Sequence, residues 1–174
     1  MKLLIAYGTT EGQTRKIAEA VATQIGELGH DVEVFDTTGL LGERHPETFD
    51  KIIVAGSVHE KQHQESVAIF AVANLKKLQA KPTMFISVSL AAAFENGLPD
   101  AQGYVDSFIK DVGWQPGQTL LVAGAVRHGE YGYYREHILE HVVLKGRNLD
   151  DPESDHEFTD WKSLAKAIDV FVGT

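Results

Sequence analysis

The sequence KLLIAYGTTEGQTRKIAEAV, residues 2–21, joins an apolar run to a helical repeat through a short loop rich in hydroxyl groups. Residues 2–7 are nearly all apolar, which is typical of a short strand that is buried on both faces. From Gln13 onward the apolar residues recur at the spacing of one helix face, and Gly29 is a typical helix end. This segment predicts a strand, a loop and a helix, with the loop lying where the helix begins.

The same alternation continues along the chain. Apolar runs predict four further strands, at residues 32–35, 51–55, 83–88 and 119–123. Helical spacing predicts helices at residues 65–78, 102–112 and about 159–170. Because strands that alternate with helices form a parallel sheet covered on both faces, the predicted class is α/β with five parallel strands.

Residues 127–157 interrupt this alternation. They contain several tyrosines, a segment at 134–144 with helical spacing, and an acidic stretch with a proline at 150–157. We interpret them as an elaboration between the fifth strand and the last helix. The sequence has no linker, internal repeat or low-complexity tract, so we predict a single domain over residues 1–174.

The loop at residues 8–14 carries three threonine hydroxyls and two glycines. An anion is stabilised at a helix N-terminus by free N–H groups and by the helix dipole, and each hydroxyl can donate a hydrogen bond. The loop lacks the lysine of a Walker A loop and the glycine spacing of a dinucleotide-binding loop. The pattern favours a terminal monophosphate over a triphosphate. The alternative is an ordinary capped helix behind a solvated, threonine-rich turn.

The composition excludes several kinds of chemistry. The chain has no cysteine, which excludes disulfides, thiolate nucleophiles and cysteine-ligated clusters, so redox chemistry would need an organic cofactor or a non-thiolate metal. The formal net charge of -9 disfavours nucleic-acid binding. No apolar run approaches the roughly 18 residues of a membrane span. The chain enters its first predicted strand almost at once, so we expect no signal peptide and a cytoplasmic location.

The stretch from Tyr7 to Thr14 resembles the phosphate loop of flavodoxins, in which a Thr/Ser-x-Thr-Gly-x-Thr pattern surrounds the phosphate of flavin mononucleotide (FMN). The resemblance implies a flavodoxin-like three-layer sandwich with strand order 2-1-3-4-5 and FMN at the carboxyl ends of the strands. It also implies that segments after the third and fourth strands hold the isoalloxazine ring. The implied cofactor-binding residues are Thr9, Thr10, Glu11, Gly12, Gln13, Thr14, Ser57, Val58, His59, Ser89, Leu90, Ala91 and Ala92.

A scattered but collinear set of residues resembles one subgroup of that superfamily, the menaquinone-dependent protoporphyrinogen IX dehydrogenases. The set comprises residues 87–90, 114–116, 123–127 and 158–161, with single aromatic residues between them. The resemblance implies an enzyme that oxidises protoporphyrinogen IX in haem synthesis and passes the electrons to a quinone. One alternative is a flavodoxin-type electron carrier between redox protein partners, which the acidic charge favours through electrostatic docking. Another is a regulatory domain that binds a different phosphate.

Two further features are candidate sites. Arg127 could pair with a propionate of a flat substrate and Tyr131 could form part of its pocket, although ordinary packing of the elaboration on the sheet edge is the commoner explanation of such residues. Residues 59–63 match the His-Glu-x-x-His pattern, and a second pair of histidines stands at 137 and 141. The zinc pattern requires a helix, whereas residues 59–63 follow a predicted strand, so we predict no metal site. We interpret residues 59–63 instead as a loop beside the flavin or in solvent, from which His59 could donate a hydrogen bond to the flavin or tune its potential.

Overall fold

The computed structural model describes residues 1–39, 45–126 and 155–173 of the chain. Five parallel strands form the central sheet in the order β2-β1-β3-β5-β6. Their bounds are Lys2–Gly8 for β1, Asp31–Asp36 for β2, Lys51–His59 for β3, Thr83–Ser89 for β5 and Gln118–Ala123 for β6. Because β5 and β6 are the fourth and fifth predicted strands, the predicted order 2-1-3-4-5 is confirmed.

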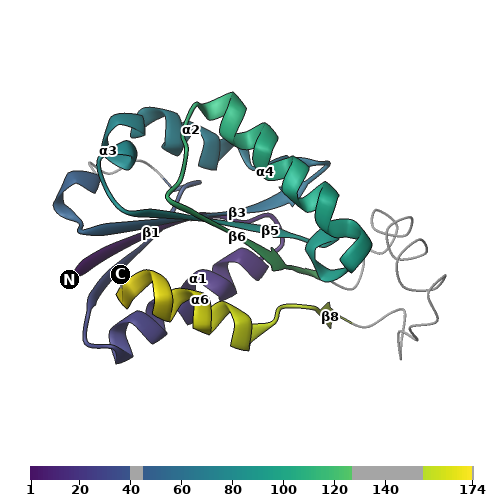
Figure 1. Ribbon diagram of the computed structural model, residues 1–174, viewed down its shortest axis with the longest axis horizontal. Helices are drawn as coiled ribbons and strands as arrows, with labels where there is room; N and C mark the ends of the chain where they lie inside the picture. Colours follow the sequence, from purple (N-terminus) through teal and green to yellow (C-terminus); the bar gives the residue numbers. More distant parts are fainter. Residues whose placement is uncertain (40–44, 127–154, 174) are drawn as a thin grey trace.

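Helices cover both faces of this sheet, so the predicted three layers are also confirmed (Figure 1). Helices α1 (Gln13–Glu27) and α6 (Trp161–Gly173) lie on one face. Helices α2 (Glu65–Ala73), α3 (Leu75–Gln79) and α4 (Leu98–Val112) lie on the other. Short 3-10 turns lie at Pro46–Thr48, Ala91–Ala93 and Glu95–Gly97.

Strand β1 shows why the sheet is buried on both sides. Its alternate residues Leu3 and Ile5 pack in the core beneath α1 and α6, while Leu4 and Ala6 pack in the core beneath α2 and α4. All four are fully buried, and burial of a large aliphatic side chain contributes about 1.5–3 kcal/mol. This double burial explains why the sequence of β1 is almost continuously apolar.

Several element boundaries differ from the predictions. Strand β3 continues to His59, so residues 57–59 belong to the strand end rather than to a loop after it. The chain then turns back into β4 (Gln62–His63), which pairs antiparallel with β3. The predicted helix at 65–78 is divided at Asn74, whose side-chain amide donates to the Phe70 carbonyl oxygen at 3.0 Å.

Two other differences concern the later part of the chain. Helix α4 begins at Leu98, four residues before the predicted start, with a proline in its first turn where a missing N–H is tolerated. Strands β7 (Ala125–Val126) and β8 (His156–Glu157) form a small antiparallel pair that the sequence did not predict. The predicted helix at 134–144 and most of the elaboration lie outside the described residues.

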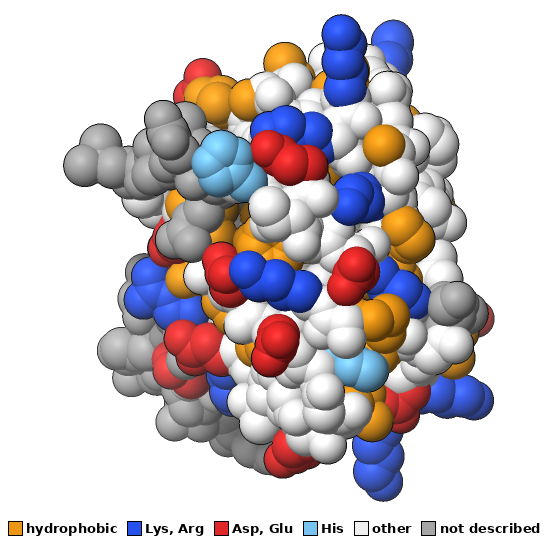
Figure 2. Space-filling model, turned by 90° about the vertical axis from the view of Figure 1, so that its left-hand side faces the viewer, with side chains coloured by type: hydrophobic (Ala, Val, Ile, Leu, Met, Phe, Trp, Pro, Cys, Tyr) orange, Lys and Arg blue, Asp and Glu red, His pale blue; other side chains and the backbone are white. Residues whose placement is uncertain are grey.

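The end of the molecule at which β1 begins carries a mixed surface. Figure 2 shows Lys and Arg side chains interspersed with Asp and Glu on this end. The ion pair Lys2–Glu33 joins β1 to β2, and the ion pair Lys77–Glu47 joins α3 to the 3-10 turn at Pro46–Thr48, both at 2.8 Å. The described part of this end therefore offers no continuous basic surface of the kind that nucleic acids require. Among the described helices, none has the length and apolar character needed to cross a bilayer.

Candidate cofactor site

A cleft opens at the carboxyl ends of the central strands. One wall is the loop between β1 and α1, which contributes Thr9, Thr10, Glu11, Gln13 and Thr14. The other walls are residues 57–59 of β3, residues 88–90 at the end of β5, and residues 124–125 after β6. The cleft therefore lies where ligands bind in open parallel sheets, outside the carboxyl ends of the strands.

The structure brings most of the predicted site residues together. Ten of the thirteen line this cleft, and the three that do not are Gly12, Ala91 and Ala92. Gly12 is the N-cap residue of α1, and the two alanines lie in the 3-10 turn after β5. Sequence reasoning missed Val88, Gly124 and Ala125, although Gly124 and Ala125 follow a predicted strand whose end must reach the same sheet edge. Arg127 and Tyr131 lie outside the described residues.

Gly12 fixes the conformation of the loop between β1 and α1. Its φ of 92° lies in the left-handed region that favours glycine, and its N–H donates to Thr9 Oγ1 at 2.9 Å. Gly12 is also the N-cap of α1, and no side chain caps this helix. Since the first N–H groups of a helix have no partners within the helix, they are available to an anion bound in the loop.

The hydroxyl groups of the cleft share one hydrogen-bonding pattern. Thr9 Oγ1 accepts from the Gly12 N–H, and Ser89 Oγ accepts from the Ala92 N–H at 3.2 Å. Thr10 Oγ1 accepts from Gln64 Nε2 at 2.8 Å, and Ser57 Oγ is in contact with the same nitrogen. A hydroxyl has one proton to donate. Each of these oxygens already accepts, so each proton can be donated to an occupant of the cleft.

Thr14 occupies the most enclosed position of the loop. Its residue is 0% exposed, and its Oγ1 has no hydrogen-bond partner among the described residues. A buried polar atom without a partner costs free energy unless a ligand satisfies it. The described lining of the cleft contains neither lysine nor arginine, so neutral hydroxyl and amide donors dominate this site.

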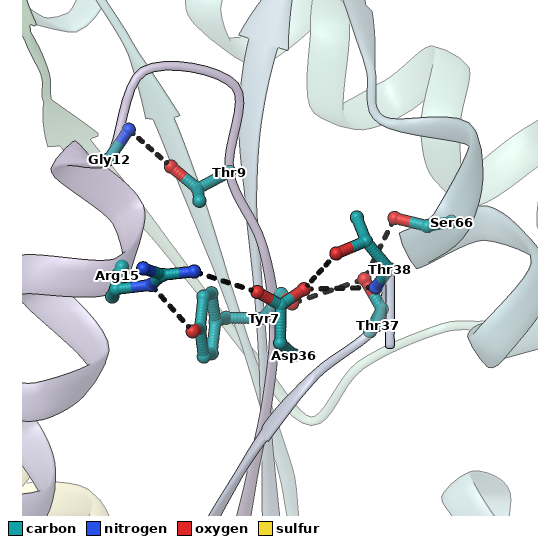
Figure 3. Close-up of polar contacts among 8 residues, drawn as sticks. All are labelled: Tyr7, Thr9, Gly12, Arg15, Asp36, Thr37, Thr38 and Ser66. Atoms are coloured by element: carbon teal, nitrogen blue, oxygen red, sulfur yellow. Dashed lines mark hydrogen bonds and ion pairs between the residues drawn. The ribbon is translucent and has the colours of Figure 1, made fainter. Parts of the chain in front are cut away.

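Arg15, which lies just after the loop in sequence, pairs with residues outside the cleft. Figure 3 shows the Arg15 side chain directed at Tyr7 and Asp36 rather than at the contact between Thr9 and Gly12. Arg15 Nε donates to the Tyr7 hydroxyl at 2.9 Å, and Nη2 lies 3.1 Å from Asp36 Oδ2. Burial alone would raise the pKa of Asp36, but hydrogen bonds from Thr38 and Arg15 outweigh it and lower this pKa. The Arg15–Asp36 pair therefore ties α1 to the end of β2.

A second set of contacts ties the start of α1 to the segment before α6. The Gln13 amide donates to Thr159 Oγ1 at 2.9 Å and to Glu157 Oε2 at 3.2 Å. Thr159 in turn donates to the Ala123 carbonyl oxygen at 2.7 Å, at the end of β6. Burial acts to raise the pKa of Glu157, but hydrogen bonds from Lys16, Trp161 and Gln13 lower it overall. These contacts hold the N-terminal end of α1 against the wall of the cleft at the end of β6.

The hairpin formed by β3 and β4 contains two histidines, whose side chains lie in different surroundings. His59 lines the cleft, and its Nδ1 lies 3.8 Å from Glu11 Oε1 of the opposite wall. His63 belongs to β4, and its side chain packs with its ring against Phe85 and Phe108 and its Nε2 2.9 Å from Ser87 Oγ. Burial lowers the pKa of His63 to about 4, so this imidazole is neutral at pH 7. Across the described residues, no group of three potential ligands surrounds a common metal position.

The turn of this hairpin is unusual for its residue types. Glu60 and Lys61 both have positive φ, 50° and 65°, although neither is glycine or asparagine. Two consecutive positive φ values are typical of the tight turn whose twist matches paired antiparallel strands. The turn fixes the end of β3 and thereby the position of His59 in the wall of the cleft.

Comparisons with known proteins agree with this geometry. Residues 4–152 match the family described as the flavodoxin domain. Protoporphyrinogen IX dehydrogenase (quinone) of Escherichia coli is 27% identical over 166 residues, which covers 95% of this chain and 91% of that protein. The protein of the same name from Leishmania major is 21% identical over 176 residues, covering 98% of this chain and 74% of the relative.

A solved structure also has the same fold. The oxidised flavodoxin 1 of Bacillus cereus aligns with a TM-score of 0.55 at 14% identity, covering 99% of this chain and 98% of that one. At this identity the likeness concerns the fold alone. It is consistent with the strand order and with the position of the cleft at the carboxyl ends of the strands.

Proposed function

Because this chain belongs to the flavodoxin family, we propose that it is an FMN-dependent oxidoreductase whose cofactor occupies the cleft. The loop between β1 and α1 would hold the phosphate of FMN, and residues 57–59 and 88–90 would hold the isoalloxazine ring. FMN supplies the redox chemistry, and the protein binds and orients it. Val58, Val88 and Leu90 provide the apolar contacts that a flat ring requires.

The observation that carries this proposal is the set of cleft hydroxyl groups whose own protons are available for donation. Thr9 and Thr10 already accept from N–H groups, and the Thr14 hydroxyl is buried without a partner. Together with the N–H groups at the start of α1, these donors can neutralise a phosphate monoester without a basic side chain. The residues present therefore fit the phosphate end of FMN.

For the reaction, we propose oxidation of protoporphyrinogen IX in haem synthesis, with a quinone or another small molecule as electron acceptor. Support comes from the name of the Escherichia coli relative and from the 95% of this chain that its alignment covers. Arg127 and Tyr131 remain the proposed substrate residues. We also propose that the protein works in the cytoplasm, where subcellular fractionation would find it.

A second candidate is a flavodoxin-type carrier that passes electrons between protein partners and converts no substrate itself. The formal net charge of -9 favours it, because acidic surfaces steer association with basic partners. The two candidates share the cofactor and the cleft, and they differ in what approaches the flavin.

The first experiment is purification followed by spectroscopy. The protein should be yellow and should release FMN, and not FAD, on denaturation. Steady-state turnover of protoporphyrinogen IX with a quinone supports the enzyme. Absence of turnover, together with a well-separated one-electron step in a redox titration, supports the carrier. A colourless protein that does not bind added FMN contradicts both.

A further inference from the structure

Gln64 links two walls of the cleft although it does not line it. Its Nε2 donates to Thr10 Oγ1 at 2.8 Å, in the loop between β1 and α1, and also contacts Ser57 Oγ near the end of β3. Gln64 stands immediately before α2, at the N-cap position. One amide group therefore connects the proposed phosphate loop to the proposed ring-binding segment.

The side chain of Gln64 makes these contacts instead of capping its own helix. Helix α2 has no side-chain cap, although its N-cap residue carries an amide that could accept an N–H. The Gln64 Oε1 atom is buried and has no hydrogen-bond partner in the described part of the chain. The Gln64 side-chain contacts that the structure gives are thus donations through Nε2 to hydroxyl oxygens of the cleft.

These donations prevent the two hydroxyl protons from pointing toward Gln64 Nε2. A primary amide nitrogen carries two N–H groups, so it can donate to both hydroxyls at once. Each hydroxyl oxygen then has an N–H on one lone pair, and its own proton points elsewhere. Thr10 and Ser57 both line the cleft, so both protons can be donated to its occupant.

We propose that Gln64 is a positioning residue of the cofactor site, whose amide keeps the Thr10 hydroxyl as a donor to the phosphate of FMN and the Ser57 hydroxyl as a donor to the ring. The inference rests on the proposed function, because it assumes that FMN occupies this cleft. It assigns the orientation of the site to a residue outside the phosphate-loop motif.

The substitution Gln64→Glu tests this direction of donation. A carboxylate of nearly the same shape only accepts, so the two hydroxyls would donate to it and turn their protons away from the flavin. Affinities for FMN and for riboflavin, which lacks the phosphate, are measured by quenching of flavin fluorescence. We expect FMN binding to weaken about 10- to 100-fold, because a hydrogen bond to a charged group is lost. Riboflavin binding should weaken less, since only the Ser57 contact is affected.

Two controls separate this effect from added charge and from damage to the fold. Gln62→Glu places the same charge two residues earlier, in β4, at an exposed side chain outside the cleft lining, and it should leave FMN affinity nearly unchanged. In a Thr10→Val background, Gln64→Glu should weaken FMN binding far less than in the unmodified chain, since the hydroxyl it redirects is gone. Gln64→Met, which neither donates nor accepts strongly, should give an intermediate loss and serves if the glutamate variant does not fold.

The outcomes distinguish a failure of the positioning role of Gln64 from a failure of the proposed FMN binding. If Gln64→Glu binds FMN as tightly as the unmodified protein, or weakens FMN and riboflavin equally, the positioning role is wrong while FMN binding stands. A loss that persists undiminished in the Thr10→Val background also overturns it, since charge repulsion alone would explain that result. If the unmodified protein binds neither flavin, the proposed function and this inference fail together.

Discussion

Thr14→Val should change the stability of the protein and its affinity for FMN in opposite senses. The substitution keeps the branched shape of the side chain and replaces the hydroxyl by a methyl group. Without cofactor, the Thr14 hydroxyl is buried and unsatisfied among the described residues. A buried polar group left unpaired costs about 1–3 kcal/mol, so the flavin-free variant should be more stable by roughly 1 kcal/mol.

The affinity for FMN should fall for the same reason. A hydroxyl that donates to a phosphate makes a hydrogen bond to a charged group, which contributes about 1.5–3 kcal/mol. Its loss should raise the Kd by about 10- to 150-fold. At an FMN concentration of about 100 times the original Kd, the ligand adds about 2.7 kcal/mol to the unmodified protein but only about 0.4 kcal/mol to a variant weakened 100-fold. The order of stability should therefore reverse when FMN is added.

Urea unfolding with and without FMN, together with calorimetric titration, measures both effects. Thr14→Ser is the matched control, because it keeps the hydroxyl and should keep most of the affinity. The reasoning is refuted if Thr14→Val binds FMN as tightly as the unmodified protein. It is also refuted if the flavin-free variant is clearly less stable than the unmodified chain, since the hydroxyl would then have a partner in the absence of the cofactor.

Three further predictions concern the surroundings of the site. Gly8→Ala should destabilise the protein by about 1–3 kcal/mol, because the added Cβ would lie 2.5 Å from Val67 Cγ2. Adding Val67→Ala to this variant should restore part of the lost free energy of unfolding, as measured in urea. Gly12→Ala has open space for its Cβ but must adopt a φ of 92°, so we expect its free energy of unfolding in urea to fall by about 1–2 kcal/mol. Gly12→Asn should lose less. Burial lowers the pKa of His63 from 6.5 to about 4, so as the pH falls the unfolded chain protonates this imidazole before the folded chain does. The contribution of His63 to stability is therefore complete above pH 6.5 and is lost between pH 6.5 and 4, by at most about 1.4 kcal/mol per pH unit. When the free energy of urea unfolding is measured against pH, His63→Gln should flatten the profile in this range. An unchanged profile would show that other groups control it.

The centre of the sheet could be predicted from the sequence because strands β1, β3 and β5 are buried on both faces over most of their length. Such strands are continuous apolar runs, as residues 3–6 illustrate, and they alternate with helical repeats of clear spacing. The end of β3 could not be predicted in the same way. Its last three residues are Ser57, Val58 and His59, which are not a continuous apolar run, and the pairing with β4 that extends the strand depends on two non-glycine residues with positive φ.

The candidate site was predictable where it is local in sequence. The loop between β1 and α1 carries its hydroxyls and glycines within seven residues, so an anion site could be proposed there from the sequence alone. Gly124 and Ala125 join the cleft only because β6 ends at the same sheet edge, which requires the topology. Gln64 had no motif to mark it, since its contacts with Thr10 and Ser57 depend on how the start of α2 packs against both walls.

The position of the phosphate in a crystal structure of the FMN-saturated protein tests the central claim most directly. The claim predicts a phosphate oxygen within about 3.2 Å of Thr14 Oγ1, with Thr9 and Thr10 as neighbouring donors and no lysine or arginine bound to it. A phosphate that lies in solvent or against a basic side chain, with the Thr14 hydroxyl still unpaired, would contradict it.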